Sequence, residues 1–269
     1  MRLLGGMHYL VLGGEASWDE SPSAHADFLS GFVRAQGVQT NEVQRSWVLV
    51  PLVARVAERA GAAEIDLVEL GPSAGLILVW DRYRCEYAAG AAGPDDARVV
   101  LRGEERRAVR ASLLGHVPRV RGRVGIDRAP VDVTQPDAAR LLKSFVWADQ
   151  TERLDRLELA IETLRDDPPE LIAADFVDEL PKVLASRSRH VLTVVFQTAA
   201  LGYVDEQGRE RVRKTLAEAG AKTPLAFVSA GNPRGGVQDW GLRIVYWPGG
   251  EREFAGHAEY HGRWLDLDI

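Results

Sequence analysis

The chain has 269 residues, of which 46% are hydrophobic and 27% charged, and its formal net charge is -6. This balance is typical of a globular protein and excludes a disordered chain, and the length suits one elaborated α/β domain of about 250 residues. The negative charge provides no basic field for a phosphate backbone. It therefore argues against nucleic acid as the main partner and favours a small-molecule substrate or a protein.

The cysteine and histidine content limits the compartment and the metal chemistry. The single cysteine, Cys85, rules out an intramolecular disulfide and is typical of a reducing compartment, so we expect a cytoplasmic protein. One cysteine and six scattered histidines provide no metal-ligand spacing, so no metal site is expected. The apolar start, Met1 to Leu12, predicts a helix rather than a signal peptide, and no stretch is long enough to span a membrane.

The first 61 residues are predicted to be helical. Leu3–Leu12 forms the first helix, and Ser21-Pro22 opens a second. A third begins at Thr40-Asn41-Glu42, where Thr40 or Asn41 can cap it, and it ends at Gly61. Residues 1–61 are therefore expected to form an N-terminal helical cap.

The pattern then changes from helix to strand. Ile65–Leu70 is a short apolar, β-branched run that suits a buried parallel strand, Gly71–Gly75 is a glycine turn, and Leu76–Trp80 is predicted to be helical. Strand-like runs at 83–87 and 98–101 follow, separated by a loop. We interpret residues of about 82–104 as an inserted hairpin.

Strands and helices alternate along most of the remaining chain. Strands are predicted to end at Asp127 and Asp175 and to cover 191–196 and 225–228, and helices to cover 136–145, 151–164 and 206–219. Such alternation implies a mainly parallel sheet with right-handed crossovers. Residues 242–267 are predicted to form a closing antiparallel hairpin.

The strongest functional motif is Glu69-Leu70-Gly71-Pro72-Ser73-Ala74-Gly75. A glycine turn after the first strand lets the backbone approach a ligand, and an acidic residue there can bind the amino-acid or ribose end of a nucleoside. In class I S-adenosylmethionine (SAM) methyltransferases this turn is usually acid-x-Gly-x-Gly-x-Gly, and Ser73 replaces the middle glycine. The predicted cofactor-binding residues of the motif are Glu69, Gly71, Ser73, Ala74 and Gly75. The alternative is an ordinary connection between a strand and a helix.

Two further carboxylates, Asp127 and Asp175, end predicted strands, where the ligands of open α/β sheets bind. In the methyltransferase arrangement the first would bind ribose hydroxyls and the second the adenine amino group, with Asp132 as an alternative to Asp127. Either carboxylate can instead cap the next helix. The whole pattern predicts a Rossmann-like class I SAM-methyltransferase fold over residues 62–269, in one structural unit with the helical cap.

Nearly the whole chain also resembles an uncharacterised bacterial family, domain of unknown function 2332. The motifs that carry the resemblance are His8–Leu12, Thr40–Arg45, Glu69–Leu76 with Asp81–Tyr83, Gly125–Asp132, Trp147–Gln150 with Arg153-Leu154, and His261–Trp264. The resemblance implies a methyltransferase-like fold without establishing an activity. The chain departs from the family in having Gln197-Thr198 where a His-Ser pair is common, and in lacking further helices expected before Leu3.

The polar residues of these motifs and of the predicted fourth strand are candidates for substrate chemistry. Asn41, Glu42 and Arg45 fall at one end of a predicted helix, where Asn41 and Arg45 share a face or form only a cap and a salt bridge. Gln197 and Tyr203 follow the fourth strand, where methyltransferases often bind their acceptor. His261 can act as a general base or be structural.

We expect SAM to be the cofactor and an unknown small molecule to accept its methyl group. A different class of hypothesis is a non-catalytic nucleoside-binding or protein-interaction module. A third follows from Gly71-Pro72-Ser73-Ala74-Gly75, because Gly-x-Ser-x-Gly is also the nucleophile turn of α/β hydrolases. In that hydrolase Ser73 would be the nucleophile, with Asp175 or Asp178 and His257 or His261 as its partners.

Overall fold

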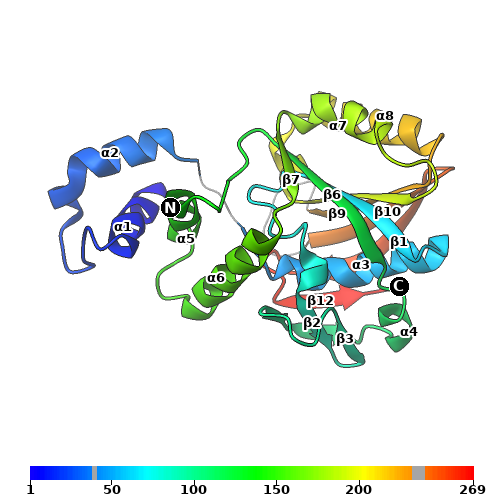
Figure 1. Ribbon diagram of the computed structural model, residues 1–269, viewed down its shortest axis with the longest axis horizontal. Coiled ribbons are helices and arrows are strands. Elements are labelled where there is room, and N and C mark those ends of the chain that lie inside the picture. Colours follow the sequence, from blue (N-terminus) through cyan, green and yellow to red (C-terminus); the bar gives the residue numbers. More distant parts are fainter. Residues whose placement is uncertain (38–40, 232–239) are drawn as a thin grey trace. The chain divides into compact units, whose positions relative to one another are not determined.

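Figure 1 shows the computed structural model, which describes residues 1–37, 41–231 and 240–269. The chain divides into two compact units. We call them the helical unit (Met1–Val43 and Val131–Asp167) and the sheet unit (Gln44–Pro130 and Pro168–Ile269). The helical cap predicted over residues 1–61 stays a prediction.

The sheet unit is built on a large, mostly parallel sheet with the strand order β5-β12-β11-β10-β9-β8-β1-β6-β7. The strands are β1 (Glu64–Leu70), β5 (Glu104–Arg107), β6 (Arg119–Asp127), β7 (Glu170–Ala173), β8 (Leu192–Thr198), β9 (Leu225–Gly231), β10 (Trp240–Trp247), β11 (Glu251–Ala258) and β12 (Trp264–Leu267). From β7 to β9 neighbouring strands run parallel, whereas β9 to β12 pair antiparallel. The predicted mixed α/β class and antiparallel C-terminal strands are confirmed.

Helices cover both faces of this sheet (Figure 1). On one face lie α7 (Phe176–Ala185) and α8 (Glu206–Gly220), whose apolar side chains, among them Leu180 and Val212, pack against β1, β6 and β9. On the other lies α3 (Arg45–Ala60). Because both faces are covered, β1 and β8 are buried along nearly their whole length, as their continuous apolar runs predict.

The inserted region is more elaborate than a hairpin. Its strands β2 (Arg84–Tyr87), β3 (Gly90–Ala92) and β4 (Val100–Leu101) form a second sheet in the order β3-β2-β4. Trp47 of α3 stacks on Tyr87 of β2, with 5.4 Å between ring centroids. The chain then joins the edge of the main sheet as β5, before the short helix α4 (Ala111–Leu114) leads to β6.

The helix predicted at Leu76–Trp80 is wrong. The segment consists of consecutive turns closed by i to i+3 hydrogen bonds, such as Leu78 N–H to Gly75 O at 3.1 Å, and ends in a 3₁₀ helix, Trp80–Arg82. Leu76 to Trp80 are buried on all sides, so their apolar character reflects burial rather than one helical face.

The helical unit consists of α1 (Arg2–Leu12), the 3₁₀ helix Pro22–His25, α2 (Ala26–Ala35), α5 (Pro136–Ser144) and α6 (Thr151–Asp166). Its core includes Met7, Leu10 and Leu29. The predicted helices at the chain start, at 136–145 and at 151–164 are thus confirmed. Within the described ranges, no helix combines the length and the apolar character needed to cross a membrane.

Candidate functional site

The strand order of the sheet reverses at β1. Strands β6 and β7 lie on one side of β1 and β8 and β9 on the other, so the carboxyl ends of five parallel strands meet at one edge. Open α/β sheets bind their ligands outside such an edge, next to the strand where the order reverses. We call the polar side chains around the ends of β1, β6 and β8, together with Arg45, the edge site.

The glycine turn after β1 is held in a left-handed backbone conformation. The φ angles are 72° at Gly71, 54° at Ser73 and 81° at Gly75. A Cβ atom at Gly71 would come within 2.7 Å of the Ala200 Cβ, and one at Gly75 within 3.0 Å of Pro169. Backbone conformation and close packing thus explain both glycines, and Ala74 is fully buried in the same turn.

Asp127 stands at the end of β6 and is half-buried. Its Oδ2 accepts a hydrogen bond from the Ser73 N–H at 2.9 Å, and its Oδ1 accepts one from the Ala129 N–H at 2.9 Å. A carboxylate can accept about four hydrogen bonds, so capacity remains for ligand hydroxyls. The alternative residue, Asp132, lies in the helical unit and accepts hydrogen bonds from Thr134.

Asp175 is a helix cap. It is the N-cap residue of α7, where Oδ1 accepts a hydrogen bond from the Val177 N–H at 2.9 Å, and its other oxygen is paired with Arg128. Burial raises the pKa of Asp175, but the hydrogen bonds from Arg128 and Val177 outweigh it and hold the pKa below its ordinary value. Asp175 therefore makes the contacts of a helix cap, which was the alternative role predicted from the sequence.

Glu69 is buried near the end of β1, beside Gly125 of β6 and Phe196 of β8. Its side chain is 2% exposed, and Oε2 has no hydrogen-bond partner. Burial, and secondly the nearby Asp127 carboxylate, raises the pKa of Glu69 to about 8, although the Arg45 charge opposes the shift. Glu69 therefore changes protonation near neutral pH, which is frequent for groups in functional sites.

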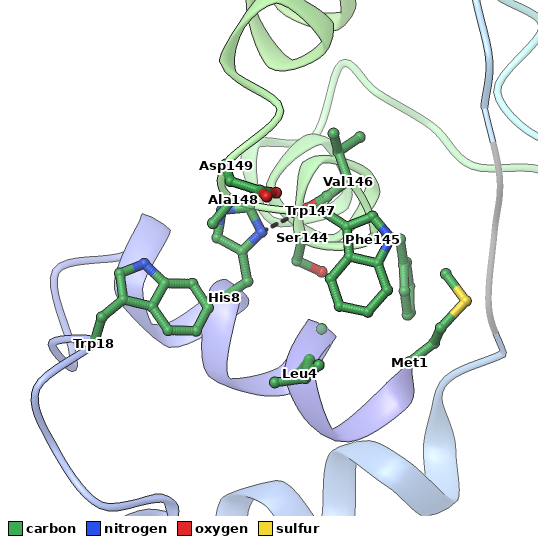
Figure 2. A pocket seen from close by; sticks show the side chains of 11 residues that line it. Met1, Leu4, His8, Trp18, Ser144, Phe145, Val146, Trp147, Ala148 and Asp149 are labelled. Carbon is green, nitrogen blue, oxygen red and sulfur yellow. Dashed lines mark hydrogen bonds between the residues drawn. The ribbon is translucent and has the colours of Figure 1, made fainter. Parts of the chain in front are cut away.

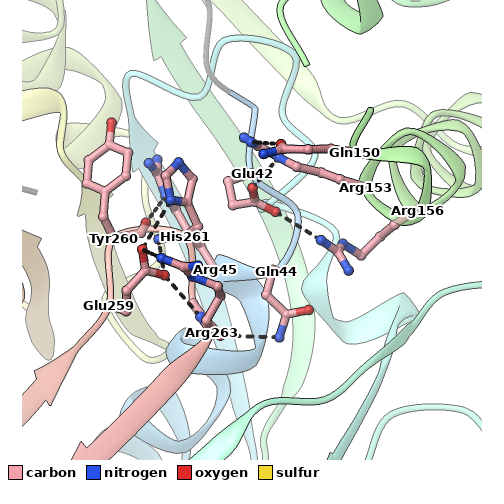
Figure 3. Close-up of polar contacts among 11 residues, drawn as sticks. Glu42, Gln44, Arg45, Gln150, Arg153, Arg156, Glu259, Tyr260, His261 and Arg263 are labelled. Carbon is pink, nitrogen blue, oxygen red and sulfur yellow. Dashed lines mark hydrogen bonds and ion pairs between the residues drawn. The ribbon is translucent and has the colours of Figure 1, made fainter. Parts of the chain in front are cut away.

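Arg45, the first residue of α3, is 4% exposed. Its guanidinium lies 4.6 Å from the ring centroid of Trp240 and 4.3 Å from that of Tyr260. Nε donates to the Tyr260 carbonyl oxygen at 3.0 Å and Nη1 to the Thr198 carbonyl oxygen at 3.3 Å, while Nη2 has no hydrogen-bond partner in the described ranges. Figure 3 shows Arg45 beside Tyr260 and His261.

His261 lies in the loop between β11 and β12 and has a carboxylate partner. Its Nδ1 is 3.2 Å from the Glu259 Oε1, and its backbone N–H donates to the Glu259 Oε2 at 2.9 Å (Figure 3). Although burial raises the pKa of Glu259, hydrogen bonds from Arg263 and His261 hold it below its ordinary value. A carboxylate that orients a histidine is the arrangement of a general base.

The two candidates that follow β8 differ in their surroundings. Gln197 is buried, and its Nε2 donates to the Ser229 hydroxyl at 2.8 Å and to the Ala230 carbonyl oxygen at 3.1 Å. It cross-links β8 and β9. Tyr203 is 85% exposed in the 3₁₀ helix Ala200–Tyr203, so it contributes nothing to the buried edge site.

Asn41 and Glu42 belong to the helical unit, and α3 begins only at Arg45, with Gln44 as its N-cap residue. The predicted helical face shared by Asn41 and Arg45 is therefore not formed, and the proposed cap Thr40 lies outside the described residues. The Glu42 carboxylate forms ion pairs with two arginines of α6 (Figure 3). Its Oε2 lies 2.6 Å from Arg153 Nε, and its Oε1 lies 3.6 Å from Arg156 Nη2.

The helical unit also contains a cavity of about 470 Å³ (Figure 2). Its walls include Trp18, Phe145 and Trp147, with His8 between them, and the His8 Nδ1 is 2.9 Å from the Val146 carbonyl oxygen. Burial lowers the pKa of His8, although its backbone hydrogen bonds oppose the shift. No sequence pattern predicts this cavity, because its walls come from distant segments.

Sequence reasoning missed the aromatic residues around Arg45 and the partner of His261, namely Trp240, Tyr260 and Glu259. Glu259 and Tyr260 directly precede His261 in the sequence, which was the available signal for these two residues. In the described part of the chain, no group of three or more histidine, cysteine, aspartate or glutamate residues could hold a metal ion.

The chain belongs to a family of uncharacterised proteins conserved in bacteria (DUF2332), whose model matches residues 1–267. The resemblance seen in the motifs is therefore confirmed. No curated protein matches the chain.

Proposed function

We propose that this family member binds an adenosyl cofactor, SAM, at the edge site and transfers its methyl group to a small-molecule acceptor. The observation that carries the proposal is the glycine turn directly after the strand at which the sheet order reverses. The order β7-β6-β1-β8-β9 corresponds to the 3-2-1-4-5 order of dinucleotide-binding sheets, whose first turn lies against the ligand.

The charged groups of the edge site suit a nucleoside with an amino-acid tail. Asp127 retains acceptor capacity for ribose hydroxyls after its two backbone contacts, and Glu69 and Arg45 supply two buried polar groups near the same turn. Because Asp175 is occupied by its helix and by Arg128, the proposal gives it no direct role. Methyl transfer depends mainly on aligning donor and acceptor, so it needs no dedicated acid or base.

Calorimetric titration with SAM, S-adenosylhomocysteine and adenosine tests the cofactor assignment. We expect saturable binding of SAM and S-adenosylhomocysteine, and at least about tenfold weaker binding in Asp127→Asn, which removes a charged acceptor. Asp178→Asn is the matched control, because Asp178 of α7 pairs with Arg211 of α8, outside the edge site. A folded wild-type protein that binds none of the three ligands would refute the proposal.

A second candidate, a serine hydrolase, is favoured by the left-handed conformation of Ser73 and by the pair of His261 with Glu259. Against it, no regular helix follows the turn, and Asp175 and Asp178 are paired with Arg128 and Arg211. A fluorophosphonate probe that labels wild type but not Ser73→Ala would favour the hydrolase over the methyltransferase.

A further inference from the structure

Arg45 is a buried cation that has no anionic partner among residues 1–37, 41–231 and 240–269. Its polar contacts in the described part of the chain are the carbonyl oxygens of Tyr260 and Thr198, and no carboxylate lies within ion-pair distance. Carbonyl dipoles and aromatic faces stabilise a guanidinium but leave its charge uncompensated. Because proteins rarely bury a charge without a counter-charge, the arrangement suits an anionic group of a bound ligand.

Two other charged residues of the sheet unit, the buried Asp66 and the half-buried Arg123, have ion-pair partners within the unit. Asp66, whose side chain is 3% exposed, pairs with Arg121 at 2.6 Å. Arg123 forms two hydrogen bonds to Asp81, at 2.6 and 2.9 Å. Arg45 therefore differs from Asp66 and Arg123, because it has no ion-pair partner among the described residues.

The nearest candidate counter-charge, Glu69, does not fill this role. It is close enough for the Arg45 charge to lower its pKa, but no hydrogen bond joins the two side chains. Glu69 Oε2 and Arg45 Nη2 both lack a hydrogen-bond partner among the described residues. With its pKa raised to about 8 by burial, Glu69 is mostly protonated at neutral pH. A neutral carboxyl group can donate a hydrogen bond to an anion beside Arg45.

The local backbone adds further positive potential. Arg45 opens a 16-residue helix with no acidic residue in its first turn, so no carboxylate there offsets the positive end of the helix dipole. Trp240 and Tyr260 hold the guanidinium plane, and Nη2 remains as its unused donor. A planar guanidinium fixed in this way suits a carboxylate, whose two oxygens lie in one plane.

We propose that Arg45 binds the carboxylate group of the ligand of the edge site, with Glu69 as a second contact to that group. The inference rests on the proposed function for the identity of the ligand: in SAM, this group is the α-carboxylate of the amino-acid tail. The ligand class is thus a nucleoside that carries a carboxylate, rather than a nucleoside alone.

The test compares S-adenosylhomocysteine with 5′-methylthioadenosine, which lacks the amino-acid tail, by calorimetry on wild type, Arg45→Met and Arg59→Met. Arg59 lies on the same helix and pairs with Glu251 at the surface, so it is the matched control. We expect wild type and Arg59→Met to bind S-adenosylhomocysteine at least about tenfold more tightly than methylthioadenosine. Arg45→Met should bind both ligands with about the affinity that wild type has for methylthioadenosine.

Equal affinity of wild type and Arg45→Met for S-adenosylhomocysteine would overturn the inference while leaving the cofactor assignment intact. If Arg45→Met does not fold, equal affinity of wild type for the two ligands would overturn it.

If wild type binds neither nucleoside, the proposed function fails and thermal shift with L-methionine decides the inference. Stabilisation of wild type and Arg59→Met but not Arg45→Met would support it, and no stabilisation of wild type would overturn it.

Discussion

The backbone N–H of Ser73 donates a hydrogen bond to the Asp127 carboxylate over 2.9 Å, which joins the turn after β1 to the end of β6. The other oxygen of Asp127 holds the Ala129 N–H, so one carboxylate braces the turns that follow two neighbouring strands. Ser73 itself occupies a left-handed conformation, with φ at 54°. A Cβ atom disfavours that conformation, and the brace compensates for its cost.

Ser73→Gly should stabilise the sheet unit and retain cofactor binding. Glycine adopts a positive φ without the Cβ clash, and the N–H donor to Asp127 remains, so we expect a gain of about 0.5 to 1 kcal/mol in the free energy of unfolding. Urea denaturation measures this gain, and calorimetry with S-adenosylhomocysteine measures the binding.

Ser73→Ala is the control, because alanine keeps the Cβ and the strain but lacks the hydroxyl. It should lack the gain in stability that Ser73→Gly shows, and it should retain binding. Loss of binding in both variants would instead assign the ligand contact to the Ser73 hydroxyl and contradict the role given to the backbone turn.

Glu69 should make stability fall as the pH rises. Its pKa is raised to about 8 in the folded protein from an ordinary value of 4.5, so between these values the folded state keeps a proton that the unfolded state has lost. Its contribution is fully present below pH 4.5, declines by at most about 1.4 kcal/mol per pH unit, and is lost above pH 8.

Glu69→Gln removes this titration and keeps a neutral side chain of similar shape. Chemical denaturation of wild type and variant at pH 6, 7 and 8 should show a stability difference that moves in favour of the variant as the pH rises. Parallel pH profiles would show that the pKa of Glu69 is not raised in the folded protein.

The sequence predicted most of the sheet, because buried parallel strands are the simplest pattern to recognise. The continuous apolar runs of β1 and β8 are buried on both faces, and Asp127 stands at the end of β6 as expected. Gly71 and Gly75 also adopt the positive φ angles that a glycine turn requires.

The errors come from burial and from distant contacts. Leu76 to Trp80 looked helical because all are apolar, but complete burial produces the same composition without a helical period. Helix α3 begins only at Arg45, and Glu42 pairs instead with Arg153, more than a hundred residues away. The rings of Trp240 and Tyr260 contact Arg45 from about 200 residues away in the sequence, and no local pattern encodes such a contact.

Glu42→Gln should destabilise the helical unit. Glu42 is 2% exposed and pairs with Arg153 and Arg156, so its loss leaves two cations without their counter-charge. Breaking a buried ion pair costs about 3 to 5 kcal/mol, and we expect about 2 kcal/mol here because the arginines are partly exposed.

The control is Glu158→Gln, which breaks a more exposed pair with Lys143 and should cost less than about 1 kcal/mol by thermal or chemical denaturation. Equal losses in the two variants would contradict the importance of burial.

Tyr260→Leu should weaken ligand binding only through Arg45. The tyrosine ring lies 4.3 Å from the guanidinium, whereas the contact of Arg45 with the residue-260 carbonyl oxygen survives the substitution. Loss of one cation–π contact is expected to lower the affinity for S-adenosylhomocysteine about fivefold and to leave methylthioadenosine unchanged.

A double-mutant cycle shows whether the ring acts on the ligand or on Arg45. In the Arg45→Met background, Tyr260→Leu should have no further effect on S-adenosylhomocysteine binding, because the group that it positions is absent. Phe254→Leu is the matched control, since Phe254 lies under Arg243, 5.7 Å away, on β11. Additive losses in the double variant would show that Tyr260 contacts the ligand itself, and the edge site would then include an aromatic wall as well as a carboxylate-binding arginine.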